Sequence, residues 1–424
     1  MREAPTDGWI LAGEIDGEPA LPLLADVAGM AHGLRIACEM SRAGAERVLV
    51  IWSGSAPPPD LSDLAADPRL GAAELRLVTD VPSPGGESVL VARADRIFHR
   101  DSIVRVRDAW MAGEAPLAEL DGEEQDAVFA ASTDLAAELA RASRRRGGLA
   151  SLLAEKRRAG EVAKGETPWL GFCIPTSDER AVRRAEAKLV SSLRKKADGY
   201  AARVLNRHVS LFITRRIVRT PITPNMVTVF AFFSALAGGI IIADGSYWAG
   251  VLGMTLVEIG SIVDGVDGEL ARLRCRFSRL GQWMDTVTDD VSNLCYWTGT
   301  MISLRAAGVE WAFPLWLAAV CCFVITQSIQ YYFIAVVYKS GDLAAIPWAM
   351  QSTEFLEQRP TGLIPRLKAG LPKLFKRDFA VTLFLVMALA DFLEGVLVIA
   401  GGGAIVFFGM MIVQLVRRRP RPTR

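Results

Sequence analysis

Residues 264–289 read DGVDGELARLRCRFSRLGQWMDTVTD, and the interpretation of the whole chain starts from this stretch. Its acids form two pairs, spaced three and four residues apart: Asp264 with Asp267, then Asp285 with Asp289. Because residues at these spacings lie on one face of a helix, each pair shares a face. Apolar runs flank the stretch on both sides. The acids therefore lie at the ends of two hydrophobic helices, where carboxylates are costly and mark a functional site.

Four carboxylates at close range repel one another unless cations lie between them. A pair of hard divalent metal ions with oxygen ligands, such as Mg²⁺, would remove this repulsion. The stretch therefore indicates two bound Mg²⁺ ions, with Mn²⁺ as the alternative.

The spacing of the stretch also fits a longer pattern, D-x2-D-G-x2-A-R-x8-G-x3-D-x3-D, at all eight fixed positions. This pattern resembles the signature of the CDP-alcohol phosphotransferases, also called phosphatidyltransferases. The matching residues are Asp264, Asp267, Gly268, Ala271, Arg272, Gly281, Asp285 and Asp289. A polar loop with coincidental acids is the alternative, and the number of matching positions disfavours it.

The resemblance implies a role for each group of residues. It implies metal ligands at Asp264, Asp267, Asp285 and Asp289. Asp289 would also act as the general base that takes the proton from an acceptor hydroxyl, after which CMP leaves. The CDP-binding residues would be Gly268, Ala271, Arg272 and Gly281. Candidates to bind the phosphate of an acceptor are Arg207, Arg274, Arg276 and Arg279, with anchoring to anionic lipid headgroups as the alternative.

Composition favours a membrane protein with two domains. The chain has 424 residues, 51% of them hydrophobic, and a mean hydropathy of +0.26. Its net charge of +1 gives no sign of a nucleic-acid partner. Six cysteines show no zinc-site spacing. The N-terminus lacks a basic segment followed by an apolar core, so we expect no signal peptide.

The second half, 224–424, predicts a helical membrane domain with six transmembrane helices, since about 20 apolar residues cross a bilayer. The expected spans are 225–243, 247–271, 282–303, 310–337, 377–393 and 395–416. The links 272–280 and 338–377 and the tail 417–424 hold most of the Arg and Lys residues, whereas the opposite links contain only Arg305. The positive-inside rule then places both termini and the acids in the cytosol, on a cell or inner membrane.

The first half, 1–190, predicts a cytosolic, mostly parallel α/β domain, because strand and helix patterns alternate. Expected strands are 48–53, 75–78, 88–91, 127–130 and 169–174, and expected helices include 33–43 and 135–143. Residues 33–54 and 89–103, the latter containing Asp95, resemble sugar-phosphate nucleotidyltransferases. Those enzymes open with a glycine-rich loop carrying Arg and Lys, whereas this chain has Glu14 and Asp16 there. We therefore expect a degenerate, non-catalytic domain with a scaffold or regulatory role, and residual nucleotidyl transfer or nucleotide binding is the alternative. Asp95 is then a strand-end surface acid, with a metal ligand as the alternative, and His32 and His99 are surface or packing residues.

The segment 191–223 predicts an amphipathic junction whose basic helix lies at the membrane surface. Its pattern K-x2-D-G…N-R-x2-S resembles the junction in fusions of a cytidylyltransferase-like domain to a phosphotransferase, of the inositol-1-phosphate cytidylyltransferase/di-inositol-phosphate-phosphate synthase type. The residues that carry it are Lys195, Asp198, Gly199, Asn206, Arg207 and Ser210. The segment P-N-x2-T, with Pro224, Asn225 and Thr228, also resembles the family's entry to its first membrane helix.

These resemblances imply an enzyme that moves a substituted phosphate from a CDP-alcohol to a hydroxyl acceptor, with an inositol phosphate as the favoured acceptor. The donor stays open between CDP-diacylglycerol and CDP-inositol, because the signature contacts only their shared CDP end. The resemblance to this family also implies that the protein forms a homodimer. Two other classes of protein are alternatives: an ion carrier that uses the intramembrane acids, and a catalytically idle membrane anchor that displays a binding module.

Overall fold

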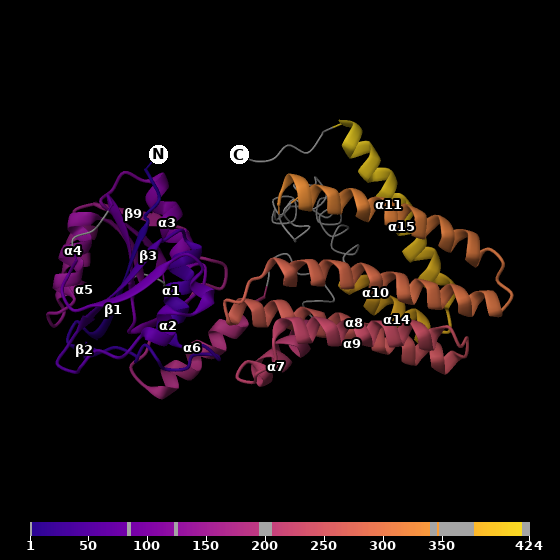
Figure 1. Cartoon of the computed structure of the whole chain (residues 1–424), viewed down its shortest axis with the longest axis horizontal. Helices are drawn as coiled ribbons and strands as arrows, with labels where there is room; N and C mark the ends of the chain where they lie inside the picture. Colours follow the sequence, from indigo (N-terminus) through magenta and orange to yellow (C-terminus); the bar gives the residue numbers. More distant parts are fainter. Residues whose placement is uncertain are drawn as a thin grey trace. The chain divides into compact units, whose positions relative to one another are not determined.

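The computed structural model of the protein describes residues 2–82, 86–122, 126–194, 206–339, 346 and 377–417. The chain forms two compact units. The first comprises Met1–Leu193 with the short segments Val218–Thr220 and Arg272–Arg276, and the second comprises the remainder. Figure 1 shows the sheet of the first unit and the long helices of the second. The predicted junction residues Lys195, Asp198 and Gly199 lie outside the described residues.

The first unit contains a mixed sheet with the strand order β4-β3-β1-β5-β8-β7-β9. The short strand β2 pairs with the last two residues of β1. Its strands are β1 (Asp7–Ile15), β2 (Glu18–Pro19), β3 (Arg47–Ser53), β4 (Glu74–Val78), β5 (Ser88–Arg93), β7 (Leu117–Leu120), β8 (Val128–Ser132) and β9 (Val162–Gly165). The four strands β4, β3, β1 and β5 are parallel, whereas β8 is antiparallel to both β5 and β7. A separate two-stranded sheet pairs β6 (Arg96–Phe98) with β10 (Cys173–Pro175).

Helices cover both faces of this sheet (Figure 1). The alternation of buried side chains along β1 tells which helices cover each face. Trp9 and Leu11 pack in one apolar cluster with α4 and α5, while Ile10 and Ala12 pack in another with α1 and α3. The helices of this unit are α1 (His32–Arg42), α2 (Ser62–Ala65), α3 (Ser102–Ala112), α4 (Thr133–Ala142), α5 (Gly148–Arg158) and α6 (Glu179–Ser191). The first unit is therefore a three-layer α/β domain, as the alternating pattern predicted.

The predicted sheet lacked the strands β1, β2, β7 and β9, and one of its five predicted strands has other bounds. The central strand β1 was not predicted, because its glycines and acids were interpreted as the remains of a phosphate-binding loop; its buried run Trp9–Ala12 is typical of a strand covered on both faces. The predicted strand 169–174 is shortened to Cys173–Pro175. Leu170, with a φ of 61°, bends the chain before it.

The second unit is helical. Its helices are α7 (Arg207–Ile217), α8 (Pro224–Ile242), α9 (Tyr247–Leu273), α10 (Arg279–Ala306), α11 (Ala312–Tyr332), α14 (Arg377–Leu389) and α15 (Leu393–Arg417). A turn of π-helix, Phe333–Val337, extends α11. Each of the six predicted spans thus corresponds to a helix.

Length and composition suit four of these helices for crossing a membrane, among the residues that the structure describes: α8, α9, α11 with its extension, and α15. Helix α10 has 28 residues but carries the acids Asp285, Asp289 and Asp290, and α14 has only 13 residues. The structure therefore supports an integral membrane unit with four apolar spans, and the count of six remains a prediction.

Helices α8 and α10 approach each other so closely that their backbones touch. A methyl group added at Gly299 would lie 2.1 Å from the carbonyl oxygen of Gly239, and one added at Gly239 would lie 2.7 Å from the backbone of Cys295. Such contacts are how helices pack in a membrane, where small residues let backbones meet. The packing of α8 against α10 therefore depends on glycine at both positions.

We expect Gly299→Ala to destabilise the protein by about 1–3 kcal/mol, because the added methyl group meets backbone that cannot rotate away. Thermal unfolding of the full chain in detergent measures this effect. Gly402→Ala in α15 is the matched control, since nothing lies within 4 Å of a methyl group at Gly402. Equal melting temperatures for the two variants would contradict the predicted close contact.

Candidate active site

The predicted acid cluster forms where the end of α9 meets the start of α10. Carboxylate oxygens of Asp264, Asp267 and Asp285 all lie within 4.8 Å of one another. Asp264 and Asp267 come from the last three turns of α9, and Asp285 from the first two turns of α10. The helical spacing of the sequence therefore brings two acids to one face of α9, and the fold adds the third from the neighbouring helix.

The fourth acid joins the cluster through an arginine from α14. The Nη1 atom of Arg377 forms an ion pair with Oδ1 of Asp289 and lies 3.8 Å from Oδ2 of Asp264. Arg377 and Asp289 are both partly buried, with side-chain exposures of 26% and 32%. One guanidinium thus links the acids of α9 and α10.

A second polar contact holds α14 along α9. The hydroxyl of Thr382 donates to Oε1 of the buried Glu258 at 3.0 Å. Along α14 the contacts advance from Arg377 to Thr382, while along α9 they go back from Asp264 to Glu258. The two helices therefore run antiparallel, and both contacts keep Arg377 at the acids.

The start of α8 contributes a hydroxyl to the cluster. Thr223 caps this helix by accepting a hydrogen bond from the Met226 amide, and Pro224 occupies the first helical position. One turn on, the Thr228 hydroxyl donates to Oδ2 of the buried Asp267. The P-N-x2-T segment therefore both starts a helix and orients a carboxylate of the cluster.

Asp290, next to Asp289, is held away from the cluster by α11. Its Oδ2 atom accepts hydrogen bonds from Nε2 of Gln327 and, at 2.5 Å, from the hydroxyl of Tyr331. These contacts attach α10 to α11 and limit the rotation of α10 beside Asp289. Asp290 is therefore a structural acid of this site.

The donor groups of the cluster fit a hard divalent cation. All of them are carboxylate oxygens, the ligands that Mg²⁺ and Mn²⁺ prefer. They converge from two helices, and Asp267 is 8% exposed. Asp264, Asp267 and Asp285 are thus the residues that could hold such an ion. Asp289 is connected to Asp264 by the guanidinium of Arg377, which contacts both carboxylates.

The predicted CDP-binding residues surround this cluster in the chain. Gly268, Ala271 and Arg272 follow Asp267 on α9, and Gly281 lies in the first turn of α10; all four are half-buried. Ser278 caps α10 by accepting a hydrogen bond from the Gly281 amide at 2.9 Å. A methyl group at Gly281 would lie 3.2 Å from Oδ1 of Asn225, so glycine lets α8 approach this turn.

The four arginines predicted to bind an acceptor phosphate fall into two groups. Arg207 donates to Oε1 of Glu269 at 2.7 Å. Arg274 is buried, and its guanidinium donates to the carbonyl oxygens of Val218 and Thr220. Arg276 and Arg279 are exposed, and Arg279 donates to the carbonyl oxygen of Lys339 at 2.5 Å.

Acids at the carboxyl edge of the parallel strands in the first unit are engaged by an arginine. Asp95 accepts two hydrogen bonds from Arg93, at 2.9 and 2.7 Å, and Asp16 lies 3.6 Å from the same guanidinium. Arg93 is only 4% exposed. Asp95 is therefore a partly buried acid, paired with the buried Arg93 at the end of β5, and is less exposed than the predicted surface acid.

The histidines of the first unit are packing residues, one of the two roles the sequence left open. His32 and His99 are 1% and 3% exposed. Burial lowers the pKa of each imidazole to about 4, so both are neutral at pH 7. Nε2 of His32 lies 3.0 Å from the carbonyl oxygen of Ala94, which fixes the ring next to β5.

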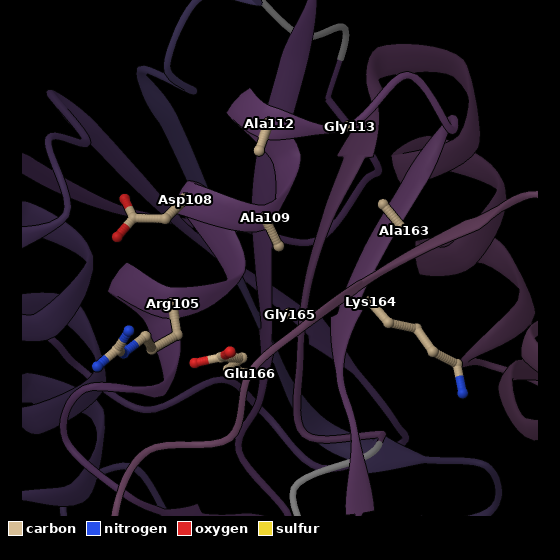
Figure 2. A pocket seen from close by; sticks show the side chains of 9 residues that line it. All are labelled: Arg105, Asp108, Ala109, Ala112, Gly113, Ala163, Lys164, Gly165 and Glu166. Atoms are coloured by element: carbon tan, nitrogen blue, oxygen red, sulfur yellow. The ribbon is translucent and has the colours of Figure 1, made fainter. Parts of the chain in front are cut away.

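A hollow of about 290 Å³ lies elsewhere in the first unit, between α3 and β9 (Figure 2). Ala109 and Ala163 line it, and the side chains of Arg105 and Lys164 point away from each other (Figure 2). Because its cations do not converge, this hollow lacks the arrangement that binds a phosphate. No predicted site residue lines it.

The second unit combines apolar helices long enough to cross a membrane with three acids that could hold a divalent cation, and comparison with known proteins agrees with this class. Residues 221–364 match the family described as CDP-alcohol phosphatidyltransferase. The C-terminal region therefore contains a CDP-alcohol phosphatidyltransferase domain, which is a transferase domain, as the signature predicted.

Individual proteins resemble parts of the chain. The "Bifunctional IPC transferase and DIPP synthase" of Aquifex aeolicus is 32% identical over 36% of this chain and 33% of its own length. The chain thus matches about a third of this relative. The phosphatidylinositol phosphate synthase of Mycobacterium tuberculosis with CDP-DAG bound is 19% identical, covering 50% of this chain and 92% of that one, with a TM-score of 0.34. The inositol-1-phosphate CTP transferase of T. maritima is 11% identical, covering 45% of this chain and 98% of that one, with a TM-score of 0.31.

Sequence reasoning missed two residues of this site. Arg377 precedes an apolar run, and its only signal is a cation at the expected cytosolic end of a span. Glu269 lies inside the signature, at a position that the pattern leaves variable. A charged residue between apolar neighbours in a membrane helix was the available signal for Glu269.

Proposed function

We propose that the second unit transfers a substituted phosphate from a CDP-alcohol to an acceptor hydroxyl and releases CMP. The observation that carries this proposal is the convergence of Asp264, Asp267 and Asp285 within 4.8 Å. Two Mg²⁺ ions are the proposed cofactors. When bound, they neutralise the pyrophosphate of the donor and align it with the acceptor.

The protein's own residues take the remaining roles. Asp289 accepts the proton of the acceptor hydroxyl; because Arg377 contacts Oδ1, we assign Oδ2 as the receiving atom. The acceptor oxygen then bonds to the phosphorus that carries the alcohol, and the bond from that phosphorus to the bridging oxygen breaks. The bridging oxygen leaves with CMP.

The CDP end of the donor is assigned to the small residues of the signature. Gly268, Ala271 and Gly281 leave room for the backbone to approach a nucleotide. Arg272 follows on the same helix and is assigned to a donor phosphate.

The acceptor is proposed to be an inositol phosphate. Relatives named "Bifunctional IPC transferase and DIPP synthase" support this choice. Of the four candidate arginines, the exposed Arg276 is best suited to a soluble phosphate, since the other three donate to Glu269 or to backbone carbonyls. The donor is then either CDP-diacylglycerol or CDP-inositol.

We further propose that the protein is a homodimer in the cell membrane with both termini in the cytosol. The basic links 272–280 and 338–377 support this orientation. A site at the cytosolic face would receive an inositol phosphate from the compartment in which it dissolves, and it would be within reach of either donor.

Release of CMP tests the proposed reaction. Purified full-length protein with Mg²⁺ is supplied with CDP-diacylglycerol or CDP-inositol, with and without inositol 1-phosphate, and CMP is quantified. We expect CMP only when donor, acceptor and metal are all present. No CMP from any pair would favour the idle anchor, and metal-dependent ion flux in liposomes would favour the carrier.

The first unit is proposed to be a non-catalytic scaffold, and Asp95 provides the test. We expect Asp95→Ala to leave CMP release unchanged but to destabilise the first unit by about 1–3 kcal/mol, because the buried Arg93 loses two hydrogen bonds. Thermal unfolding and CMP release measure the two effects. The double variant Arg93→Met/Asp95→Ala is the control and should recover stability. A large loss of CMP release would show that the units are functionally coupled.

A further inference from the structure

A fully buried carboxylate lies inside the signature stretch without being one of its fixed positions. Glu269, in α9, is 0% exposed. Its Oε1 atom accepts hydrogen bonds from Nη1 of Arg207 and the hydroxyl of Ser210, both at 2.7 Å. Its Oε2 atom accepts one from the hydroxyl of Thr214 at 2.6 Å. Both oxygens are therefore bound by side chains of α7.

The three donors lie on one face of α7, because positions 207, 210 and 214 follow helical spacing. Other positions of α7 expose apolar side chains: Val209 is 38% and Phe212 57% exposed. Part of the polar surface of α7 thus faces α9, while large apolar residues face outward. The hydrogen bonds to Glu269 are therefore a main attachment of α7 to α9.

This attachment lies next to the acid cluster. Gly265 precedes Glu269 by one helical turn and shares its face of α9. A methyl group added at Gly265 would lie 3.8 Å from Nη1 of Arg207. Gly265 follows Asp264 directly and precedes Asp267 by two residues, so the guanidinium of Arg207 lies beside the backbone that carries both acids.

We propose that Glu269 is a positioning residue for the acid cluster, which holds α7 against α9 and keeps the guanidinium of Arg207 away from Asp264 and Asp267. The negative charge of Glu269 offsets the attraction between the Arg207 guanidinium and the other acids of α9. Without the Glu269 carboxylate, Arg207 pairs with the nearby acids and competes with a divalent cation for them. This inference rests on the proposed function in that the acids hold a metal.

Two measurements test this role without turnover: the binding of a metal ion, and the protection of the α7 amides against hydrogen exchange. Binding of Mn²⁺ to the full-length protein in detergent is followed by electron paramagnetic resonance of the free ion. We expect Glu269→Gln to weaken Mn²⁺ binding by about 10- to 100-fold, the range for residues that orient metal ligands. Hydrogen–deuterium exchange should become faster in residues 207–217.

Two further variants separate this role from general damage to the fold. Arg207→Gln/Glu269→Gln should recover most of the Mn²⁺ affinity, because the competing cation is gone. Glu258→Gln makes the same substitution at another buried position of α9 and should leave exchange in 207–217 unchanged. Unchanged exchange in Glu269→Gln, or Mn²⁺ binding that the double variant does not recover, overturns the proposal. A wild-type protein that binds no Mn²⁺ contradicts the proposed metal site, and exchange in 207–217 still decides whether Glu269 anchors α7.

Discussion

Asp289→Asn is expected to lower CMP release by about 10²- to 10⁴-fold, the usual contribution of a general base. An amide has the shape of a carboxylate and keeps an oxygen that can accept a hydrogen bond from Arg377, but it cannot take a proton from a hydroxyl. The loss should therefore appear in the chemical step. Binding of CDP in the presence of Mg²⁺, measured by calorimetry, should stay close to wild type, because Asp264, Asp267 and Asp285 remain.

The neighbouring acid provides the matched control for this variant. Asp290→Asn changes the same group one residue later, where the carboxylate binds Gln327 and Tyr331 of α11. Its amide oxygen can still accept those hydrogen bonds, so this variant should retain most of its activity. Full activity in Asp289→Asn would remove the assignment of the base, and a loss of CDP binding would instead make Asp289 chiefly a ligand of the metal.

Arg377→Met is expected to lower CMP release by on the order of 100-fold, the cost of displacing a reacting group by about 1 Å. Among the residues that the structure describes, Arg377 has a guanidinium that contacts both Asp289 and Asp264. Without it the carboxylates repel one another, and Asp289 loses the contact that orients it. The metal-free protein should then melt at a lower temperature, and Mg²⁺ should raise that temperature more than in the wild type.

Arg305→Met is a suitable control, since Arg305 is an exposed arginine at the other end of α10. It should change neither CMP release nor the stabilisation by Mg²⁺. If Arg377→Met were as active as the wild type, the contact with Asp289 would have no part in positioning the base.

The acid cluster could be predicted from the sequence because its geometry is mostly local. Asp264 and Asp267 share a face through helical periodicity alone, and the signature supplies Asp285 on the next helix. Arg377 comes from α14, more than 80 residues later in the chain. No periodicity connects it to the acids, so only the packing of α14 against α9 brings it there.

In the first unit, too, the features that depend on residues far apart in the chain could not be predicted. Strands with clear alternating or branched residues, such as Arg47–Ser53, were predicted close to their observed bounds. The central strand Asp7–Ile15 was missed, because its glycines and acids carry the signal of a loop while its burial depends on helices far along the chain. Asp95 was predicted to be a strand-end surface acid, but its partial burial and its partner Arg93 became evident only from the structure.

The backbone contact between Gly239 and Gly299 bears on how a lipid-linked donor would reach the acids. An acyl chain is several ångström wide, and helices whose main chains touch leave no slot of that width between them. The seam between α8 and α10 is thus closed to a hydrocarbon tail at that depth. A donor dissolved in the bilayer would have to enter sideways between another pair of helices.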